Sequence, residues 1–157
     1  MKVVILAVGK TSAPWIAEGI DTYMKRTGRY LSASLEIIPD VKNAASLTED
    51  LRKRKEGEAI LASLQPSDHV LLLDERGKEL TSMQLAETLE NLGSRGIKRL
   101  VWVIGGPYGF SQDVYARASG LVALSRLTFT HDMTRLIIAE QLYRAVSIIN
   151  SLPYHHE

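Results

Sequence analysis

A buried strand that ends in a glycine loop is the feature that most restricts the fold of this chain. Residues 100–104 read Leu-Val-Trp-Val-Ile, and residues 105–109 read Gly-Gly-Pro-Tyr-Gly. An apolar run rich in β-branched side chains suits a strand covered on both faces, as in a parallel sheet. Ser111 then has the position of a helix N-cap, with Asp113 in the first turn. This order forms the ligand-binding edge of open α/β sheets, although a tight turn without a ligand gives the same pattern.

Strand and helix patterns alternate along the rest of the chain. Strands are predicted at residues 1–8, 35–38, 70–73, 100–104 and 121–124, and helices at 14–27, 47–64, 81–92, 111–119 and 132–150. The polar residues 74–78 are predicted to form a loop after the third strand. Alternation of this kind predicts an α/β fold with a mostly parallel sheet and helices on both faces. We expect a single domain over residues 1–157.

Local signals mark the ends of several of these elements. Ser46 with Glu49, and Thr81 with Gln84, have the spacing of capping boxes ahead of two helices. The carboxyl ends of parallel strands meet at one edge of a sheet. We therefore expect the loops after residues 73, 104 and 124 to converge there.

Composition and missing motifs exclude several classes of site. The chain has no cysteine, which removes disulfides, thiolate metal sites and cysteine nucleophiles. It contains no G-x-x-x-x-G-K-[ST], no G-x-G-x-x-G after the first strand and no G-x-S-x-G, which argues against common NTPases, dinucleotide enzymes and α/β-hydrolases. Its histidines lack a metal-ligand spacing, so no metal is expected. No apolar run is long enough for a membrane span, and we expect a soluble cytoplasmic protein.

The final predicted helix, residues 132–150, is apolar on more than one side. Such a helix is buried either in a deep core or against a second subunit, and we favour a homodimer. Its polar exceptions Glu140, Gln141 and Arg144 should be paired or directed into a site, because an unpaired buried charge is costly. Arg144 is therefore a candidate site residue, with a structural salt bridge as the alternative.

The carboxyl-terminal tail carries side chains that proteins use on unpaired RNA. Tyr154 can stack on a base, and His155 and His156 can exchange protons near neutral pH. A flexible terminal segment is the alternative. The net charge of +1 neither indicates nor excludes a nucleic-acid partner. We interpret the basic run at residues 52–55 as a solvated helix face, because such runs bind phosphates only together with other basic groups.

Taken together, several segments resemble one family over essentially the whole chain. They are residues 104–109, 124–128 with His131, 139–145 and 153–155, together with 4–9, 73–74 and 77–78. These segments resemble the ribosomal RNA large-subunit methyltransferase H family, which belongs to the SPOUT class of S-adenosyl-L-methionine-dependent methyltransferases. The resemblance implies methylation of the N3 ring nitrogen of a pseudouridine in large-subunit (23S) ribosomal RNA, within the ribosome. It also implies a homodimer and a C-terminal trefoil knot, a rare exception to unknotted folding.

The resemblance assigns residues to the cofactor by position. They are Leu73, Gly105, Leu124, Ser125, Arg126, Leu127, Thr128 and Phe129. Glycine loops and apolar side chains suit S-adenosyl-L-methionine, because its adenine, ribose and sulfonium need no phosphate motif.

Arg144, Tyr154 and His155 are the candidate catalytic residues, for charge stabilisation, stacking and proton transfer. His156 is a departure, because arginine is expected there in the family. Two other interpretations stay open. One is a non-catalytic ribosome-binding or assembly factor with a methyltransferase-like fold, and the other is a different α/β enzyme with a nucleoside-like ligand.

Overall fold

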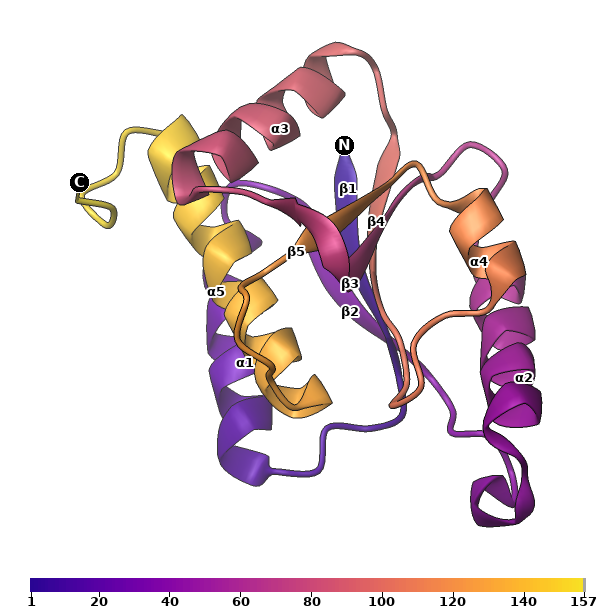
Figure 1. Cartoon of the computed structure of the whole chain (residues 1–157). Helices are drawn as coiled ribbons and strands as arrows, with labels where there is room; N and C mark the ends of the chain where they lie inside the picture. The colour runs from indigo at the N-terminus through magenta and orange to yellow at the C-terminus, as the bar shows by residue number, and fades with distance from the viewer. Residues whose placement is uncertain (157) are drawn as a thin grey trace.

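In a computed structural model, which describes residues 1–156, helices cover both faces of a five-stranded sheet (Figure 1). The strands are β1 (Lys2–Val8), β2 (Ala33–Ile38), β3 (His69–Glu79), β4 (Arg99–Ile104) and β5 (Gly120–Ala123). The helices are α1 (Pro14–Thr27), α2 (Glu49–Ala62), α3 (Ser82–Ser94), α4 (Gln112–Arg117) and α5 (His131–Ile149), with a short 3-10 helix η1 (Ala44–Ser46). Glu157, the end of the predicted domain and tail, lies outside the described residues.

All strand pairs are parallel, in the order β2-β1-β4-β3-β5. The predicted parallel α/β architecture is therefore confirmed. The apolar run at residues 100–104 lies in the middle of the sheet and is at most 2% exposed, as expected for a strand covered on both faces. The trefoil knot stays a prediction, because strand order does not define how the chain threads.

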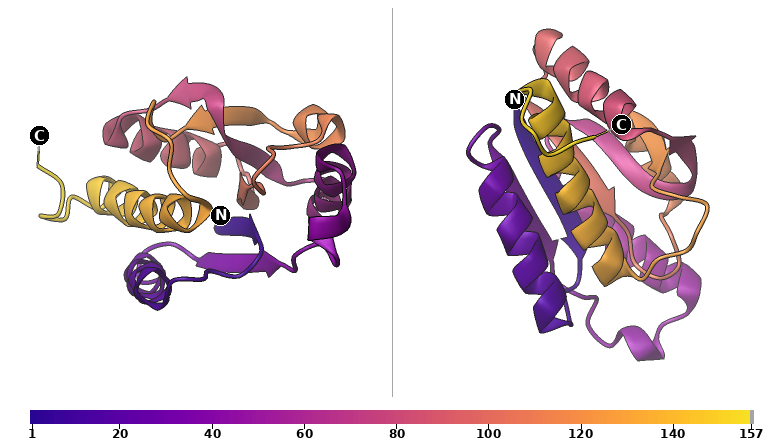
Figure 2. Two further views of the ribbon diagram at one scale, coloured as in Figure 1. Left: turned by 60° about the horizontal axis from the view of Figure 1, so that its bottom comes forward. Right: turned by 90° about the vertical axis from the view of Figure 1, so that its left-hand side faces the viewer.

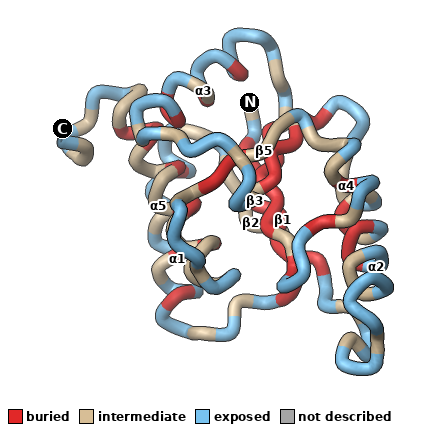
Figure 3. Tube along the Cα trace, viewed as in Figure 1, coloured by how far each residue is buried: buried red, intermediate tan, exposed pale blue. Residues whose placement is uncertain are grey.

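Each strand of the central sheet contributes to two cores, because successive side chains point to opposite faces. On one face Ile5 and Trp102 pack with α1, α3 and α5. On the other face Leu6 and Val103 pack with residues of α2 and α4. Buried residues accordingly concentrate in the sheet at the middle of the molecule (Figure 3).

The predicted polar loop at residues 74–78 is wrong, because β3 continues to Glu79. Val122 of β5 is in register with both Leu73 and Lys78, so β3 bulges between these two positions and then resumes its pairing. Gly77 lies within this bulge, where a Cβ would overlap the backbone of Val122. The polar residues at the end of β3 form a strand because β5 supplies hydrogen-bond partners for their backbone.

Two of the predicted helix caps are also wrong. Thr48, not Ser46, caps α2, and its hydroxyl accepts from Leu51 N at 3.2 Å. Ser111 precedes α4 in an extended conformation, but its hydroxyl makes no capping bond. The capping box of Thr81 and Gln84 is confirmed at the start of α3.

Helix α5 packs between α1 and α3 of the same chain (Figure 2). Four of its apolar residues are buried in that core, Ile138, Ala139, Leu142 and Ala145, and Val146 is also buried. Other apolar positions, including Leu136, Ile137, Ile148 and Ile149, are half-buried. The deep-core alternative therefore accounts for much of the helix. Within residues 1–156, no helix has the length and apolar character needed to cross a membrane.

Candidate functional site

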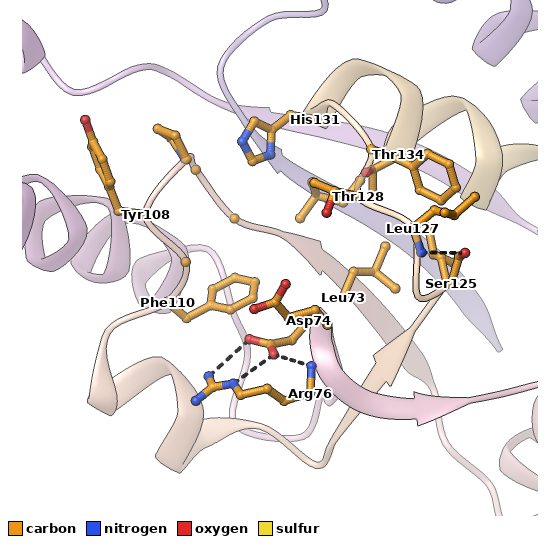
Figure 4. A pocket seen from close by; sticks show the side chains of 18 of the residues that line it. Leu73, Asp74, Arg76, Tyr108, Phe110, Ser125, Leu127, Thr128, His131 and Thr134 are labelled. Atoms are coloured by element: carbon orange, nitrogen blue, oxygen red, sulfur yellow. Dashed lines mark hydrogen bonds and ion pairs between the residues drawn. The ribbon is translucent and has the colours of Figure 1, made fainter.

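Three chain segments close on one cavity at the carboxyl edge of the sheet (Figure 4). They are the bulged part of β3, the glycine loop of residues 105–110 after β4, and the loop of residues 124–129 after β5. The cavity has a volume of about 910 Å³, within the range of small-molecule sites. Every residue assigned to the cofactor from the sequence lines it, namely Leu73, Gly105, Leu124, Ser125, Arg126, Leu127, Thr128 and Phe129. The expected convergence of the three segments is confirmed.

The glycine loop packs so closely that its first two residues have no space for a side chain. A Cβ at Gly105 would lie 2.9 Å from the buried ring of Phe110. A Cβ at Gly106 would overlap the Glu56 carboxylate. Gly105 is therefore required by packing within the loop, and Gly106 by the contact of the loop with α2.

Glu56 of α2 packs against Gly106 of the glycine loop. It was not among the candidate residues predicted from the sequence. Its side chain is 3% exposed and accepts from Arg52 Nε at 3.0 Å. The Arg52 guanidinium lies 5.5 Å from the centroid of the Tyr108 ring, on the same loop. The prediction of a solvated face for residues 52–55 is thus wrong for Arg52, although Arg54 is exposed and paired with Glu58. The four-residue spacing of Arg52 and Glu56 is the sequence pattern that indicates this ion pair on one face of a helix.

A fixed carboxylate, Asp74, lies in the wall of the cavity. Its side chain accepts from Arg76 N at 2.9 Å and from Arg76 Nε at 3.1 Å (Figure 4). It also accepts from the hydroxyl of Tyr115. Burial alone would raise the pKa of Asp74, but the hydrogen bonds from Arg76 and Tyr115 outweigh it and hold the pKa at about 2. Asp74 is therefore ionised at neutral pH.

The first turn of α5 forms another wall, through His131 and Thr134. Desolvation by the surrounding walls and the nearby Arg135 cation lower the pKa of His131, which favours a neutral imidazole. Arg135 is buried and donates to the Val8 carbonyl at 2.7 Å. Asp132 accepts from Ser12 N at 2.9 Å. These bonds fasten the loop after β1 to the helix end that borders the cavity.

The three predicted catalytic residues lie together, with Glu140, in what we call the tail cluster: Glu140, Arg144, Tyr154 and His155. Arg144 pairs with Glu140 at 2.5 Å, and its guanidinium lies 4.8 Å from the centroid of the Tyr154 ring. Tyr154 donates to Glu140 Oε1 at 3.0 Å, and His155 Nδ1 is 3.3 Å from Arg144 Nη1. Arg144 thus forms the salt bridge that was the alternative to a site role, its role in a site stays a prediction, and the tail is packed on α5.

The tail cluster and the cavity lie at opposite ends of α5 (Figure 1). Thirteen residues separate His131 from Arg144, which is about 20 Å at a rise of about 1.5 Å per residue. One chain therefore does not bring its predicted catalytic residues to its own cavity. Among residues 1–156, no three histidine or carboxylate side chains gather as metal ligands would.

Comparison with known proteins gives full-length matches. The family model described as "Predicted SPOUT methyltransferase" matches residues 1–155. A protein of Parabacteroides distasonis is 51% identical over 157 residues, and proteins of Bacteroides thetaiotaomicron and Flavobacterium johnsoniae are 48% and 47% identical. Each alignment covers 100% of both chains, and each relative is named ribosomal RNA large subunit methyltransferase H.

Proposed function

Since the chain belongs to the SPOUT methyltransferase family, we propose that it methylates large-subunit (23S) ribosomal RNA in the cytoplasm, with S-adenosyl-L-methionine as methyl donor and the N3 nitrogen of a pseudouridine as acceptor. The observation that carries the proposal is the 910 Å³ cavity, closed by three separate segments, in a chain whose relatives bear that name over their whole length. The choice of pseudouridine N3 rests on the resemblance of the sequence motifs.

The cavity has the size and lining for this cofactor. Its walls combine apolar side chains such as Leu73 and Leu124 with the loop residues 105–109 and 124–129. Such a lining grips an adenine and a ribose by apolar contact and backbone hydrogen bonds, without phosphate-binding residues. When bound, the cofactor supplies an electrophilic methyl group on a sulfonium. The residues that would hold it are those assigned from the sequence.

The tail cluster supplies groups suited to the acceptor base. The N3 nitrogen of the base would have to lose its proton to attack the methyl group that the bound cofactor would supply, so this chain must provide a group that takes the proton. His155 Nε2, which is buried and has no hydrogen-bond partner among residues 1–156, is the candidate acceptor of this proton.

Arg144 assists this step through its charge, and Tyr154 through stacking or hydrogen bonding. The hydrogen bond to Glu140 raises the pKa of Arg144, so it is a permanent cation able to stabilise negative charge on the base carbonyls. Burial, together with hydrogen bonds to Tyr23 and Glu140, raises the pKa of Tyr154. Tyr154 therefore stays a neutral phenol that can stack or donate, and it is not the base.

The distance of about 20 Å along α5 favours an active site built by two chains. In a twofold dimer, the same surface patch of each chain meets its counterpart, so an antiparallel contact brings the carboxyl end of α5 toward the partner's cavity. The half-buried apolar residues of α5 are available for this contact. We therefore propose a homodimer in which each tail cluster serves the partner's cavity. Sedimentation at low protein concentration should still show a dimer, and an active monomer would exclude this arrangement.

The direct test compares ribosomal RNA from cells with and without this protein by mass-spectrometric mapping. We expect one methyl group to disappear from one pseudouridine of the large-subunit RNA. Purified protein should restore it with labelled S-adenosyl-L-methionine, while Arg144→Ala should bind the cofactor in calorimetry but transfer no label. Binding to ribosomes without any transfer by the unmodified protein would instead indicate a non-catalytic assembly factor.

A further inference from the structure

A second hollow lies beside the tail cluster, away from the cofactor cavity. Its walls are formed by Arg26 at the end of α1, by Arg29 and Tyr30 just after it, and by Tyr143 of α5. The hollow has a volume of about 370 Å³. Helices α1 and α5 lie side by side with their carboxyl ends at the same end of the molecule (Figure 2). The hollow therefore lies at the same end of the molecule as the half-buried tail cluster.

The hollow combines positive charge with aromatic faces. Within residues 1–156, neither Arg26 nor Arg29 forms an ion pair, and both are exposed. The Arg26 guanidinium lies 5.8 Å from the ring centroids of both Tyr23 and Tyr143, so cation–π contacts orient it while its N–H groups stay available. Tyr30 exposes 46% of its surface.

The hollow is continuous with the tail cluster through Tyr143. The Tyr143 ring lies 4.7 Å from the ring of Tyr154 and 6.1 Å from that of Tyr23. Tyr154 and Tyr23 also approach each other through their hydroxyl groups, at 3.4 Å. An RNA strand bound at the tail cluster would therefore continue directly into the hollow.

We propose that the hollow binds the RNA substrate next to the nucleotide that is methylated, with a backbone phosphate on Arg26 and Arg29 and an unpaired base stacked on Tyr30. This inference rests on the proposed function. Guanidinium groups that neutralise phosphates, beside an aromatic face that stacks a base, are the combination by which proteins hold single-stranded RNA.

The test separates the phosphate contact from the cofactor and from the chemistry. For the double variant Arg26→Ala/Arg29→Ala, we expect the KM for undermethylated ribosomes to rise on the order of tenfold, while kcat and cofactor affinity stay unchanged. Binding of a short unpaired RNA oligonucleotide over a salt series should lose about 0.7 from its log–log slope, because the two arginines share one phosphate and each phosphate contact contributes about 0.7. The control Arg54→Ala removes one positive charge from α2 and should change neither quantity.

The stacking contact has its own matched pair of variants. Tyr30→Ala should weaken oligonucleotide binding on the order of tenfold, while Tyr30→Phe keeps the aromatic face and should bind as the unmodified protein does. Equal loss in both variants would overturn the stacking role.

Three outcomes distinguish the possible failures. An unchanged KM and salt slope in the double variant would overturn the inference. A double variant that sediments as a monomer, where the unmodified protein is a dimer, would show that the hollow faces a second copy of the chain. If the unmodified protein methylates no ribosomal RNA, the proposed function fails, and unchanged oligonucleotide binding in the variants then also excludes an RNA site here.

Discussion

An active site shared between two chains predicts that two inactive variants restore activity to each other. Arg144→Ala removes the guanidinium of the tail cluster and leaves the cavity intact. Gly105→Val introduces a branched side chain where even a Cβ would lie 2.9 Å from the Phe110 ring, so it displaces the cavity wall. A homodimer of either variant carries a defect in both of its active sites. A heterodimer of the two carries both defects in one site and none in the other, and should have about half of the normal rate.

The opposite arrangement gives a different result. If each tail served its own cavity, the heterodimer would have one defect in each site and would be inactive. The structure favours restored activity, because about 20 Å of helix separates the two groups within one chain.

The assay needs a pure heterodimer. The two variants are expressed together with different affinity tags, purified through both tags, and assayed for transfer of labelled methyl groups to undermethylated ribosomes. Circular dichroism melts verify that Gly105→Val is folded. A heterodimer of Arg144→Ala with Tyr154→Ala is the control and should stay inactive, because both defects then lie in the tails. A mixed Gly105→Val and Arg144→Ala heterodimer as inactive as its parents would refute the shared site.

The remaining predictions concern the tail, the glycine loop and the cavity wall. Truncation after Leu152 should abolish methyl transfer and leave cofactor affinity unchanged in calorimetry; lost affinity would mean that the tail covers the cofactor. Gly106→Ala should lower the free energy of unfolding by about 1–3 kcal/mol in urea denaturation, because its Cβ overlaps Glu56, and adding Glu56→Ala should recover part of the loss. A carboxyl group whose pKa is lower in the folded than in the unfolded protein stabilises the fold at pH values above its unfolded pKa. This contribution is lost as the pH falls through the folded pKa. Asp74→Asn should therefore be less stable than the unmodified protein at pH 7, with a difference that shrinks between the ordinary pKa of 3.8 and about 2; a difference independent of pH would exclude the Asp74–Arg76 pair as its cause.

Patterns over a few neighbouring residues determined much of the fold. The apolar run at residues 100–104 identified the central strand, because each of its residues must be covered whichever face it points to. The capping box of Thr81 and Gln84 is a contact within one turn and formed as the spacing predicted. The convergence of the segments after residues 73, 104 and 124 followed from parallel pairing alone.

Contacts between distant segments decided the rest. Polar residues of β3 became strand because β5, more than forty residues later, pairs on both sides of the bulge. Glu56 reached the glycine loop because α2 and the loop meet on one face of the sheet, and no spacing in the sequence records that meeting. The sequence identified Arg144, Tyr154 and His155 as candidates, but only the packing of α5 showed that they lie at the far end of the helix from the cavity. Periodicity and caps depend on bonds within one element, whereas these features depend on how separate elements pack.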